Sequence, residues 1–417
     1  MKILLFANTD WYLYNFRLSL AKRLRDEGHD VVLVSPPGEY GPRLRELGFR
    51  WIPVDFSTAS TNPLAELALL SRIRKLYQTE KPDLCHHFTI KCVLYGSIAA
   101  RFAGIPAVVN AVTGMGHIFT DPGLKARVLR PLVRGLYRFA LGRRGSRVIF
   151  QNDEDRNYFV SNKLVRQAST VLIRGSGVDC TVYRPVNDES KEQGSRFKVQ
   201  GSSQSPVTSH ESRVTAPVRI LFASRLLREK GIFELLDAAR AFKAAGEPVE
   251  FIFAGDIYPG NPSSLTAADL EAIRAEGLVD YRGHVDDMLP LLAECDIVVL
   301  PSYREGTPRI LIEAAAMGKP IVATDIAGCR GLVRHGENGL LAPVKTVQPL
   351  VEALKTLARD PQMRQKMGEA GRRIVLAEFD EEIVIAKTLA VYQAASPTPS
   401  HGAARHPLPG GEGKPFK

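Results

Sequence analysis

Two glutamates, Glu305 and Glu313, are separated by seven residues in a stretch that reads "REGTPRILIE". It follows the apolar run "DIVVLP", which predicts a β-strand, so the stretch itself predicts a loop that leads into a helix. A carboxylate accepts hydrogen bonds from hydroxyl groups. Glu313, one to two turns into the helix, can therefore accept from a vicinal diol such as a ribose, and Glu305 from hydroxyls at the ligand's other end. The plainer interpretation is an acidic loop followed by an exposed helix glutamate.

The start of this helix is suited to binding an anion. We expect Thr307 to cap the helix and Pro308 to fit its first turn. The backbone N–H groups from Gly306 to Arg309 would then point outward, where they favour a phosphate. Together with the glutamates, this predicts a ligand whose diphosphate lies between two hydroxyl-bearing ends.

Other polar residues follow other apolar runs of the second half. Arg225 and Lys230 follow "RILFAS", and Gly255 and Asp256 follow "FIFA". Ligands of doubly wound sheets bind beyond the carboxyl ends of the strands, so these residues belong at the same edge as the two glutamates. A guanidinium and an ammonium there can clamp a diphosphate, and "YRGHV" (281–285) can contact a nucleobase. Alternatively, both cations are solvated surface charges.

Strand-like and helix-like segments alternate through both halves of the chain. The apolar runs of the first half are "KILLFAN", "DVVLVS", "RWIPV", "PDLCHHF", "AVVNAV", "RVIFQN" and "TVLIRG", and those of the second are "VRILFAS", "VEFIFAG", "DIVVLPS" and "PIVATD". Nearly continuous apolar strands separated by helices predict parallel sheets covered on both faces. Since the pattern occurs twice, we expect an α/β fold of two doubly wound, Rossmann-like domains facing one another across a cleft.

The expected domains are residues 1–185 and 218–394. Residues 186–217 between them are polar, serine-rich and without period, which predicts a disordered linker insertion. Residues 395–417 predict a disordered tail on the same grounds. We expect neither segment to carry chemistry.

Length and composition are those of a globular protein. A chain of 417 residues is too long for one ordinary core, and 45% hydrophobic with 24% charged residues is typical of globular chains. No apolar run reaches the roughly 18 residues of a membrane-spanning helix, and the start lacks the apolar region and cleavage site of a signal peptide. The five scattered cysteines include no CxxC pair, which favours free thiols in the cytoplasm.

The net charge of +10 is concentrated in the first half. Residues 1–185 hold 27 basic and 15 acidic residues, whereas the remainder holds 28 and 30. Such an asymmetry indicates an acidic partner surface, either a membrane or a nucleic acid.

Residues 123–147 contain eight basic residues and no acidic one. A helix here would have a basic face of Arg127, Arg130, Arg134 and Arg138 and an apolar face of Leu124, Val128, Leu132 and Leu136. We expect Pro131 to kink it. A basic amphipathic helix can lie on anionic lipid headgroups. Alternatively, the apolar face packs on its own sheet and the basic face is merely solvated.

The stretches "ASRLLREKGIFELLDA", "FIFAGD", "VVLPSYREGTPRILIEAAAMGKPIVATDIAGCRGLV" and "GENGLLAPV" resemble the retaining glycosyltransferases of family 4. That family has the GT-B fold of two facing Rossmann-like domains. The pair Glu305 and Glu313 resembles its E-x7-E signature. The resemblance covers about residues 1–185 and 218–394 and is more specific in the second half.

The resemblance implies a role for each donor-side residue. Arg225 and Lys230 would bind the donor's diphosphate, Glu313 the ribose and Glu305 the hydroxyls of the donor sugar. The residues implied at the uracil are His284 and Val285. One departure is "NTDWYLYN" after the first strand, where many members carry a glycine pair. Its aromatic residues could instead shape an acceptor pocket, which also places Asn15 on the acceptor side.

Within the family, "YNFRLSLAKRL", "HHFTIKCVLYGSIAARFAGIP" and "AVTGMGHIF" are similar to transferases that extend polyprenyl-diphosphate-linked sugars in capsule, O-antigen or N-glycan assembly. The implied activity is transfer of a hexosyl unit from a UDP-sugar to such a lipid-linked saccharide. UDP-N-acetylhexosamine is the expected donor, with UDP-galactose or UDP-glucose next. The expected location is the inner face of the cytoplasmic membrane, as a peripheral protein.

The acceptor side is predicted from the first half. His117 follows two glycines in "TGMGH", where the backbone can approach a sugar closely, and we expect it to act in catalysis by contacting the donor sugar or the acceptor; a structural histidine is the alternative. His86 and His87 are adjacent on a strand and should face opposite sides, so at most one can reach the cleft. Lys91 follows them.

Catalysis without metal or cofactor is expected. A departing nucleoside diphosphate gains negative charge, which Arg225, Lys230 and the helix amides would stabilise. The acidic triplet "DED" (153–155) opens a predicted helix, where acids favour the N-terminus, so we interpret it as structural and not as a metal site.

Rival functions remain open at this stage. A UDP-sugar 2-epimerase shares the two-domain layout, but would need acid and base carboxylates at the sugar. A nicotinamide oxidoreductase needs a G-x-G-x-x-G turn, and "GSGVD" (175–179) has the wrong spacing. A nucleic-acid-binding protein would use the basic half, but that half lacks a basic motif interleaved with aromatic residues. We therefore expect no nucleic-acid partner.

Overall fold

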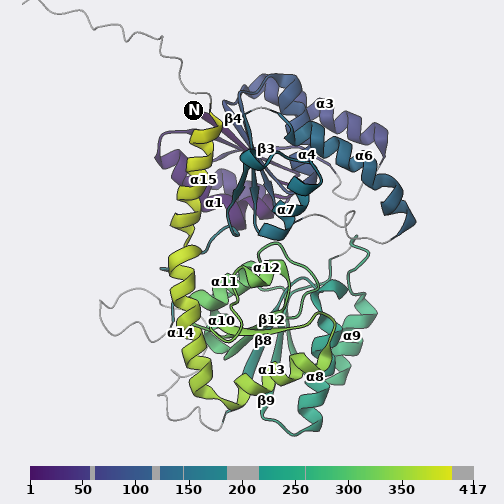
Figure 1. Ribbon diagram of the computed structural model, residues 1–417, viewed down its shortest axis with the longest axis vertical. Coiled ribbons are helices and arrows are strands. Elements are labelled where there is room, and N and C mark those ends of the chain that lie inside the picture. Colours follow the sequence, from purple (N-terminus) through teal and green to yellow (C-terminus); the bar gives the residue numbers. More distant parts are fainter. Residues whose placement is uncertain (57–61, 115–122, 144, 186–215, 259, 397–417) are drawn as a thin grey trace, which may run out of the picture.

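The computed structural model describes residues 1–56, 62–114, 123–143, 145–185, 216–258 and 260–396, without the side chains of residues 124–129. It contains two α/β domains, one above the other in Figure 1. The expected insertion and tail lie almost entirely outside the described residues.

The first domain contains a parallel sheet of order β3-β2-β1-β4-β5-β6-β7. Its strands are β1 Lys2–Phe6, β2 Asp30–Ser35, β3 Arg50–Pro53, β4 Leu84–Phe88, β5 Ala107–Val112, β6 Ser146–Phe150 and β7 Thr170–Leu172. Each coincides with one of the apolar runs expected from the sequence, with β6 starting one residue earlier, and most are buried along their length because helices cover both faces.

The second domain contains a parallel sheet of order β10-β9-β8-β11-β12-β13. Its strands are β8 Val218–Ala223, β9 Val249–Ala254, β10 Val279–Gly283, β11 Ile297–Leu300, β12 Ile321–Thr324 and β13 Gly339–Ala342. The edge strands β10 and β13 are not among the apolar runs named above, and β10 carries the charged residues Asp280 and Arg282.

Helices connect the strands. In the first domain they are α1 Asp10–Asp26, α2 Tyr40–Glu46, α3 Pro63–Glu80, α4 Ile90–Ala103, α6 Leu124–Leu141 and α7 Asp153–Ser161. In the rest of the chain they are α8 Ile232–Ala244, α9 Ala267–Glu276, α10 Leu289–Glu294, α11 Arg309–Ala316, α12 Ala327–Arg330, α13 Val347–Arg359, α14 Pro361–Glu378 and α15 Glu381–Ala395. No helix in the described part of the chain combines the length and apolarity needed to cross a bilayer.

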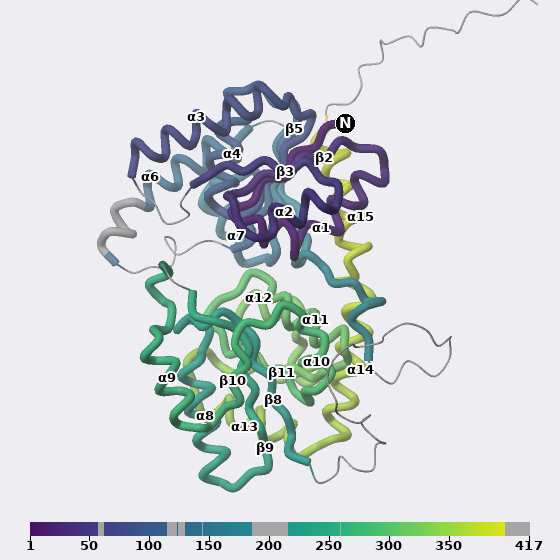
Figure 2. Tube along the Cα trace, turned by 180° about the vertical axis from the view of Figure 1, so that it is seen from behind, coloured from purple at the N-terminus to yellow at the C-terminus, as the bar shows by residue number. Residues whose placement is uncertain are grey.

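Each sheet reverses its strand order at one point, between β1 and β4 in the first domain and between β8 and β11 in the second. Loops at such a reversal diverge and leave a crevice for a ligand. The two domains face one another across these strand ends (Figures 1 and 2). The expected fold of two facing doubly wound domains is therefore confirmed.

The last helix returns to the first domain. Helix α15 packs against α1 and β5, and its Val384, Ile385 and Tyr392 join the apolar core beneath the first sheet. Figure 1 shows α14 and α15 running along one side of both domains. The sequence analysis assigned residues 218–394 to the second domain, but α15 packs on the first, because its apolar face covers that sheet.

Candidate active site

The pair Lys230 and Glu305 marks the strand-order reversal of the second domain. Lys230 ends the loop after β8, and Glu305 lies in the loop after β11. The Lys230 Nζ donates to the Glu305 Oε1 at 2.5 Å, and each side chain is only 13% exposed. An ion pair so shielded from water is stronger than a surface pair. The sequence separates these residues by 75 positions, and the fold joins them.

The loop that carries Glu305 presses against the first domain. A Cβ atom on Gly306 would lie 2.3 Å from the Thr113 carbonyl oxygen at the end of β5, so only glycine permits this approach. The Thr307 hydroxyl lies 3.5 Å from the Gln151 carbonyl oxygen of the same domain. The loop therefore lies where the domains meet.

Helix α11 follows this loop. Its N-cap residue is Pro308, and no side chain caps it. The sequence predicts Thr307 as the cap. That expectation is wrong, because the Thr307 hydroxyl turns to Gln151 across the cleft. The absence of a side-chain cap leaves the end of α11 suited to an anion.

Glu313 lies one turn into α11 and is 6% exposed. Its Oε1 accepts from the Arg309 Nε at 2.7 Å. Burial raises the pKa of the Glu313 carboxyl, and the neighbouring Arg309 guanidinium opposes that rise.

The loops after β8 and β9 lie against one another. Gly255 has φ +133°, and a Cβ atom there would lie 1.8 Å from the Ser224 carbonyl oxygen, so a side chain would force the loops apart. The Asp256 Oδ1 accepts from its neighbouring Ile257 N–H at 2.7 Å. Arg225 is exposed, with its guanidinium 5.0 Å from the centre of the Tyr258 ring. It can therefore reach a ligand without breaking an ion pair to a carboxylate in the described residues.

The segment 281–285, which we expect to contact the nucleobase, also lies at the cleft. His284 is exposed, and its Nε2 lies 3.3 Å from the Asp286 Oδ1. Asp286 also accepts from the Tyr40 hydroxyl of the first domain at 3.2 Å. Val285 is partly buried against the second-domain core.

The first-domain histidines of β4 point away from the cleft. The His86 Nδ1 lies 2.6 Å from the Tyr392 hydroxyl of α15, whereas His87 contacts Tyr77 at 3.0 Å and Asn110 at 2.8 Å. They face opposite sides of the sheet, as expected, and both are buried. Burial lowers the pKa of His86 well below its ordinary value and that of His87 to about 4. Both are therefore neutral near pH 7, and contact with an acceptor stays a prediction for either.

Asn15 and Lys91 lie nearer the strand ends. The Asn15 side chain donates to the Trp11 carbonyl oxygen at 3.0 Å, and its own carbonyl accepts from Arg309. Lys91, in the first turn of α4, donates to Glu66 at 2.8 Å. His117 lies outside the described residues.

The basic helix packs differently from the expectation. Leu132, expected on a packed face, is 62% exposed, whereas Tyr137, Ala140 and Leu141 are buried in the core of the first domain. The helix runs through Pro131 as one element. The α6 face that packs is therefore rotated from the one the sequence suggested.

The expected basic face is partly used within the domain. Arg134 donates to the Tyr158 hydroxyl at 3.0 Å and Arg138 to the Asn162 carbonyl oxygen at 3.1 Å. Arg130 is partly buried, and the side chain of Arg127 lies outside the described residues.

Two features of the cleft escaped the sequence analysis. Arg304 lies 3.3 Å from Asp155 of the first domain, and no sequence pattern links positions so far apart. Thr89, directly after β4, has φ +67° and ψ +157°, a strained conformation for a β-branched residue. Its position directly after β4, where the strand order of the first domain reverses, is the feature that could have identified it as a site residue. Nowhere in the described ranges do three His, Cys, Asp or Glu residues gather as a metal ion would require.

Two family models match the chain. Glycosyl transferase 4-like matches residues 2–152, and Glycosyl transferases group 1 matches residues 209–374. The chain is a family 4 glycosyltransferase. Glu305 and Glu313 therefore lie in a member of the family whose E-x7-E signature they resemble.

This family 4 glycosyltransferase has bacterial relatives. It is 29% identical to N,N'-diacetylbacillosaminyl-diphospho-undecaprenol alpha-1,3-N-acetylgalactosaminyltransferase of Campylobacter jejuni, over 94% of this chain and 98% of the relative. It is 24% identical to the capsular polysaccharide biosynthesis glycosyltransferase CapM of Staphylococcus aureus, over 87% and 89% of the two chains.

Solved structures share the fold of this glycosyltransferase. Anabaena Alr3699/HepE in complex with UDP has a TM-score of 0.70 and 22% identity, covering 94% of this chain and 100% of that one. Sucrose-phosphate synthase from Thermosynechococcus elongatus has a TM-score of 0.73 and 17% identity, covering 94% and 98%. The expected GT-B fold is confirmed.

Proposed function

We propose that this enzyme transfers an N-acetylhexosamine from its UDP-sugar to a saccharide carried on a polyprenyl diphosphate, with retention of configuration and without a metal. The observation that carries the proposal is the shielded Lys230–Glu305 pair at the strand-order reversal of the second domain. The name of the Campylobacter jejuni relative supports the sugar and the lipid-linked acceptor.

The donor's diphosphate would bind to the cations beside that pair. Arg225 is exposed at the strand end, and Lys230 presents its ammonium next to the start of α11. Gly306, Thr307 and Pro308 bring the amides of α11 to the same place. These groups oppose the negative charge that grows on UDP as it leaves, so they stabilise the transition state more than the bound donor.

The remaining polar groups would orient the rest of the donor. Glu313 accepts from the ribose hydroxyls and Glu305 from those of the sugar, while His284 and Val285 contact the uracil. Because Lys230 donates to Glu305, that carboxylate is held in a fixed direction. Gly255 and Asp256 hold the loop beside Arg225.

Retention requires that the new bond form on the face from which UDP leaves. The bond between the anomeric carbon and the UDP oxygen breaks, and the acceptor oxygen bonds to the same face of that carbon. The acceptor proton passes to the departing phosphate oxygen, so no protein carboxylate has to act as nucleophile.

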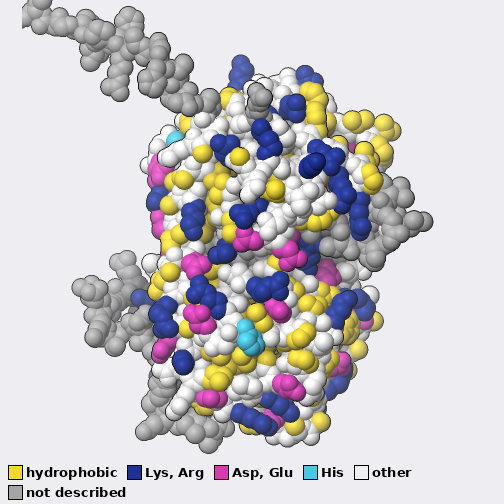
Figure 3. All heavy atoms as spheres, in the orientation of Figure 1, with side chains coloured by type: hydrophobic (Ala, Val, Ile, Leu, Met, Phe, Trp, Pro, Cys, Tyr) yellow, Lys and Arg dark blue, Asp and Glu magenta, His cyan; other side chains and the backbone are white. Residues whose placement is uncertain are grey.

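The acceptor's membrane would meet the first domain. Exposed apolar side chains lie on three neighbouring helices: Leu64 and Leu67 of α3, Phe102 of α4, and Leu132 and Phe139 of α6. Lys and Arg side chains gather beside hydrophobic ones over this face in Figure 3. Apolar side chains within a basic surface are suited to a peripheral contact with anionic lipid at the cytoplasmic face.

The test is a panel of UDP-sugars incubated with and without a polyprenyl-diphosphate saccharide, followed by UDP release. We expect release from a UDP-N-acetylhexosamine that depends on the lipid-linked saccharide. Equal release without that acceptor, or none from any UDP-sugar, would contradict the proposal.

A further inference from the structure

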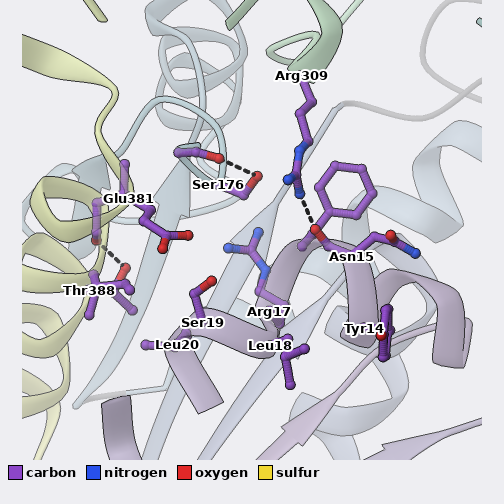
Figure 4. A pocket seen from close by; sticks show the side chains of 14 residues that line it. Tyr14, Asn15, Arg17, Leu18, Ser19, Leu20, Ser176, Arg309, Glu381 and Thr388 are labelled. Atoms are coloured by element: carbon purple, nitrogen blue, oxygen red, sulfur yellow. Dashed lines mark hydrogen bonds between the residues drawn. The ribbon is translucent and has the colours of Figure 1, made fainter. Parts of the chain in front are cut away.

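Arg309 is the first residue of α11, and its guanidinium joins two groups that belong to different domains. Its Nε donates to the Glu313 carboxylate at 2.7 Å, and a terminal N–H donates to the Asn15 carbonyl oxygen in α1. The guanidinium also lies 5.2 Å from the centre of the Phe16 ring. Figure 4 shows Arg309 reaching from the second domain to α1 beside a small cavity.

The bridge is unlike the other contacts between the domains. Tyr40 meets Asp286, Arg304 meets Asp155, and Arg330 lies 3.6 Å from Glu154. None of the three touches Glu313. Arg309 therefore couples a carboxylate of the donor site to the position of the opposite domain.

Arginine is suited to this task because its planar fork donates along two edges at fixed angles. One edge fixes the direction of the Glu313 carboxylate, and the other can bond only while α1 is close. Any shift of α1 away from α11 removes the second bond and frees the guanidinium to turn from Glu313. The two contacts therefore support one another.

We propose that Arg309 is a positioning residue that couples ribose recognition by Glu313 to the approach of the two domains. This inference rests on the proposed function, because it takes Glu313 to be the group that binds the ribose. The N-terminal amides of α11 are not involved, so the role of the Arg309 side chain is separate from phosphate binding.

The charge on Glu313 provides a specific readout. Burial raises its pKa, and Arg309 opposes that rise. The other titratable groups that act on it are Tyr183 from the interdomain connection and Asp287 after β10. A carboxylate whose pKa is raised becomes protonated as pH falls through that value, and its hydrogen bond to a ribose hydroxyl then weakens. Without Arg309, this loss begins at a higher pH.

The experiment measures the affinities of UDP and 2′-deoxy-UDP over a series of pH values from acidic to mildly alkaline. Their ratio cancels the titration of the phosphates. For the wild-type protein we expect UDP to bind about tenfold more tightly at high pH, the value of one hydrogen bond to a charged group. In Arg309→Gln the ratio should fall towards one at a higher pH than in the wild type.

Domain approach is measured in the same variants by energy transfer between dyes on Glu46→Cys and Glu352→Cys. Both positions are exposed on different domains, and the cysteines at 85, 92, 180, 295 and 329 are buried. We expect UDP to increase transfer in the wild type, and Arg309→Gln to lose at least half of that increase. Arg309→Lys keeps a cation beside Glu313 without the fork, so it should restore the pH dependence but not the transfer.

Arg330→Gln is the matched control, since it removes an interdomain cation that does not touch Glu313. It should leave the nucleotide ratio unchanged. If Arg309→Gln shows the wild-type pH dependence, or if Arg330→Gln changes both readouts equally, Arg309 has no coupling role. Failure of the wild-type protein to bind UDP would instead refute the proposed donor, and the two failures are therefore distinguishable.

Discussion

The polar residues at the two strand-order reversals differ in where they lie relative to the strands. In the second domain, Lys230 and Glu305 lie in loops beyond the strand ends and meet one another in the cleft. In the first domain, His86 and His87 lie within β4 itself and point into the layers above and below the sheet. The difference teaches that a chemically suitable residue reaches a ligand when it follows a strand, and becomes part of the core when it lies inside one.

The largest effect should come from breaking the cleft pair. Lys230→Ala and Glu305→Ala should each reduce turnover about 100-fold or more, the range for a lost contact to a developing negative charge. Each change leaves the other member of a shielded ion pair without its partner, so the melting temperature should also fall, and the rates are therefore compared per folded molecule. Wild-type rates of UDP release in either variant would show that the altered residue has no role in catalysis.

A second change in the cleft should act on binding. Glu313→Gln keeps the shape of the side chain but replaces a charged acceptor by a neutral one, and it leaves Arg309 without its ion pair. We expect the affinity for UDP to fall about 10- to 100-fold, as for a hydrogen bond to a charged group. Isothermal titration calorimetry measures this. An unchanged affinity would mean that Glu313 does not face the ribose.

The buried position of His87 in the first domain predicts an effect on stability. His87→Gln should lower the free energy of unfolding by about 1–3 kcal/mol, because Tyr77 and Asn110 lose a buried partner. The rate per folded molecule should stay near that of the wild type. A loss of turnover with intact stability would place His87 in the site and break the comparison.

The same histidine should influence acid stability. Its pKa is about 4 in the folded protein, below the ordinary value of about 6.5 in an unfolded chain. Between these values the unfolded chain binds more protons, so stability falls as pH decreases from about 6.5 towards 4. In His87→Gln this part of the decline should be absent. Urea unfolding at several pH values measures the difference, and parallel curves for the two proteins would argue against it.

The smallest effect should come from the basic surface outside the cleft. Arg138→Gln should weaken binding to anionic vesicles about fivefold, the value of one cation near such a surface. Arg359→Gln, on α13 of the second domain, is the control, because it removes another exposed positive charge, on the other domain. Equal losses in both variants would mean that net charge, and not this face, directs binding.

Much of the fold follows from local pattern. All seven first-domain strands coincide with apolar runs, because a strand buried on both faces is nearly continuously apolar. The edge strand β10 is not apolar, since its solvent-facing side needs no hydrophobic residues. The return of α15 to the first domain was not predictable either, because the apolar face of a helix does not indicate which sheet it will cover.

The site was predictable to a different degree on each side. Positions after strand ends identified Lys230 and Glu305, because topology alone brings such loops together. The contacts of Thr307 and Arg304 across the domain interface and the exposure of Leu132 depend on how domains and helices pack. Local spacing in the sequence does not encode that packing. A residue's neighbours across an interface are set by three-dimensional packing.

The return of α15 has a consequence for building hybrids of this enzyme with its relatives. A chimera joined at residue 185 would take its second domain and its last helix from one parent, and the sheet beneath that helix from the other. Val384, Ile385 and Tyr392 would then have to fit a foreign surface, and Tyr392 would meet a foreign partner in place of His86. Exchanging the first domain therefore calls for two junctions, one on each side of the second domain, so that the last helix stays with the sheet it covers.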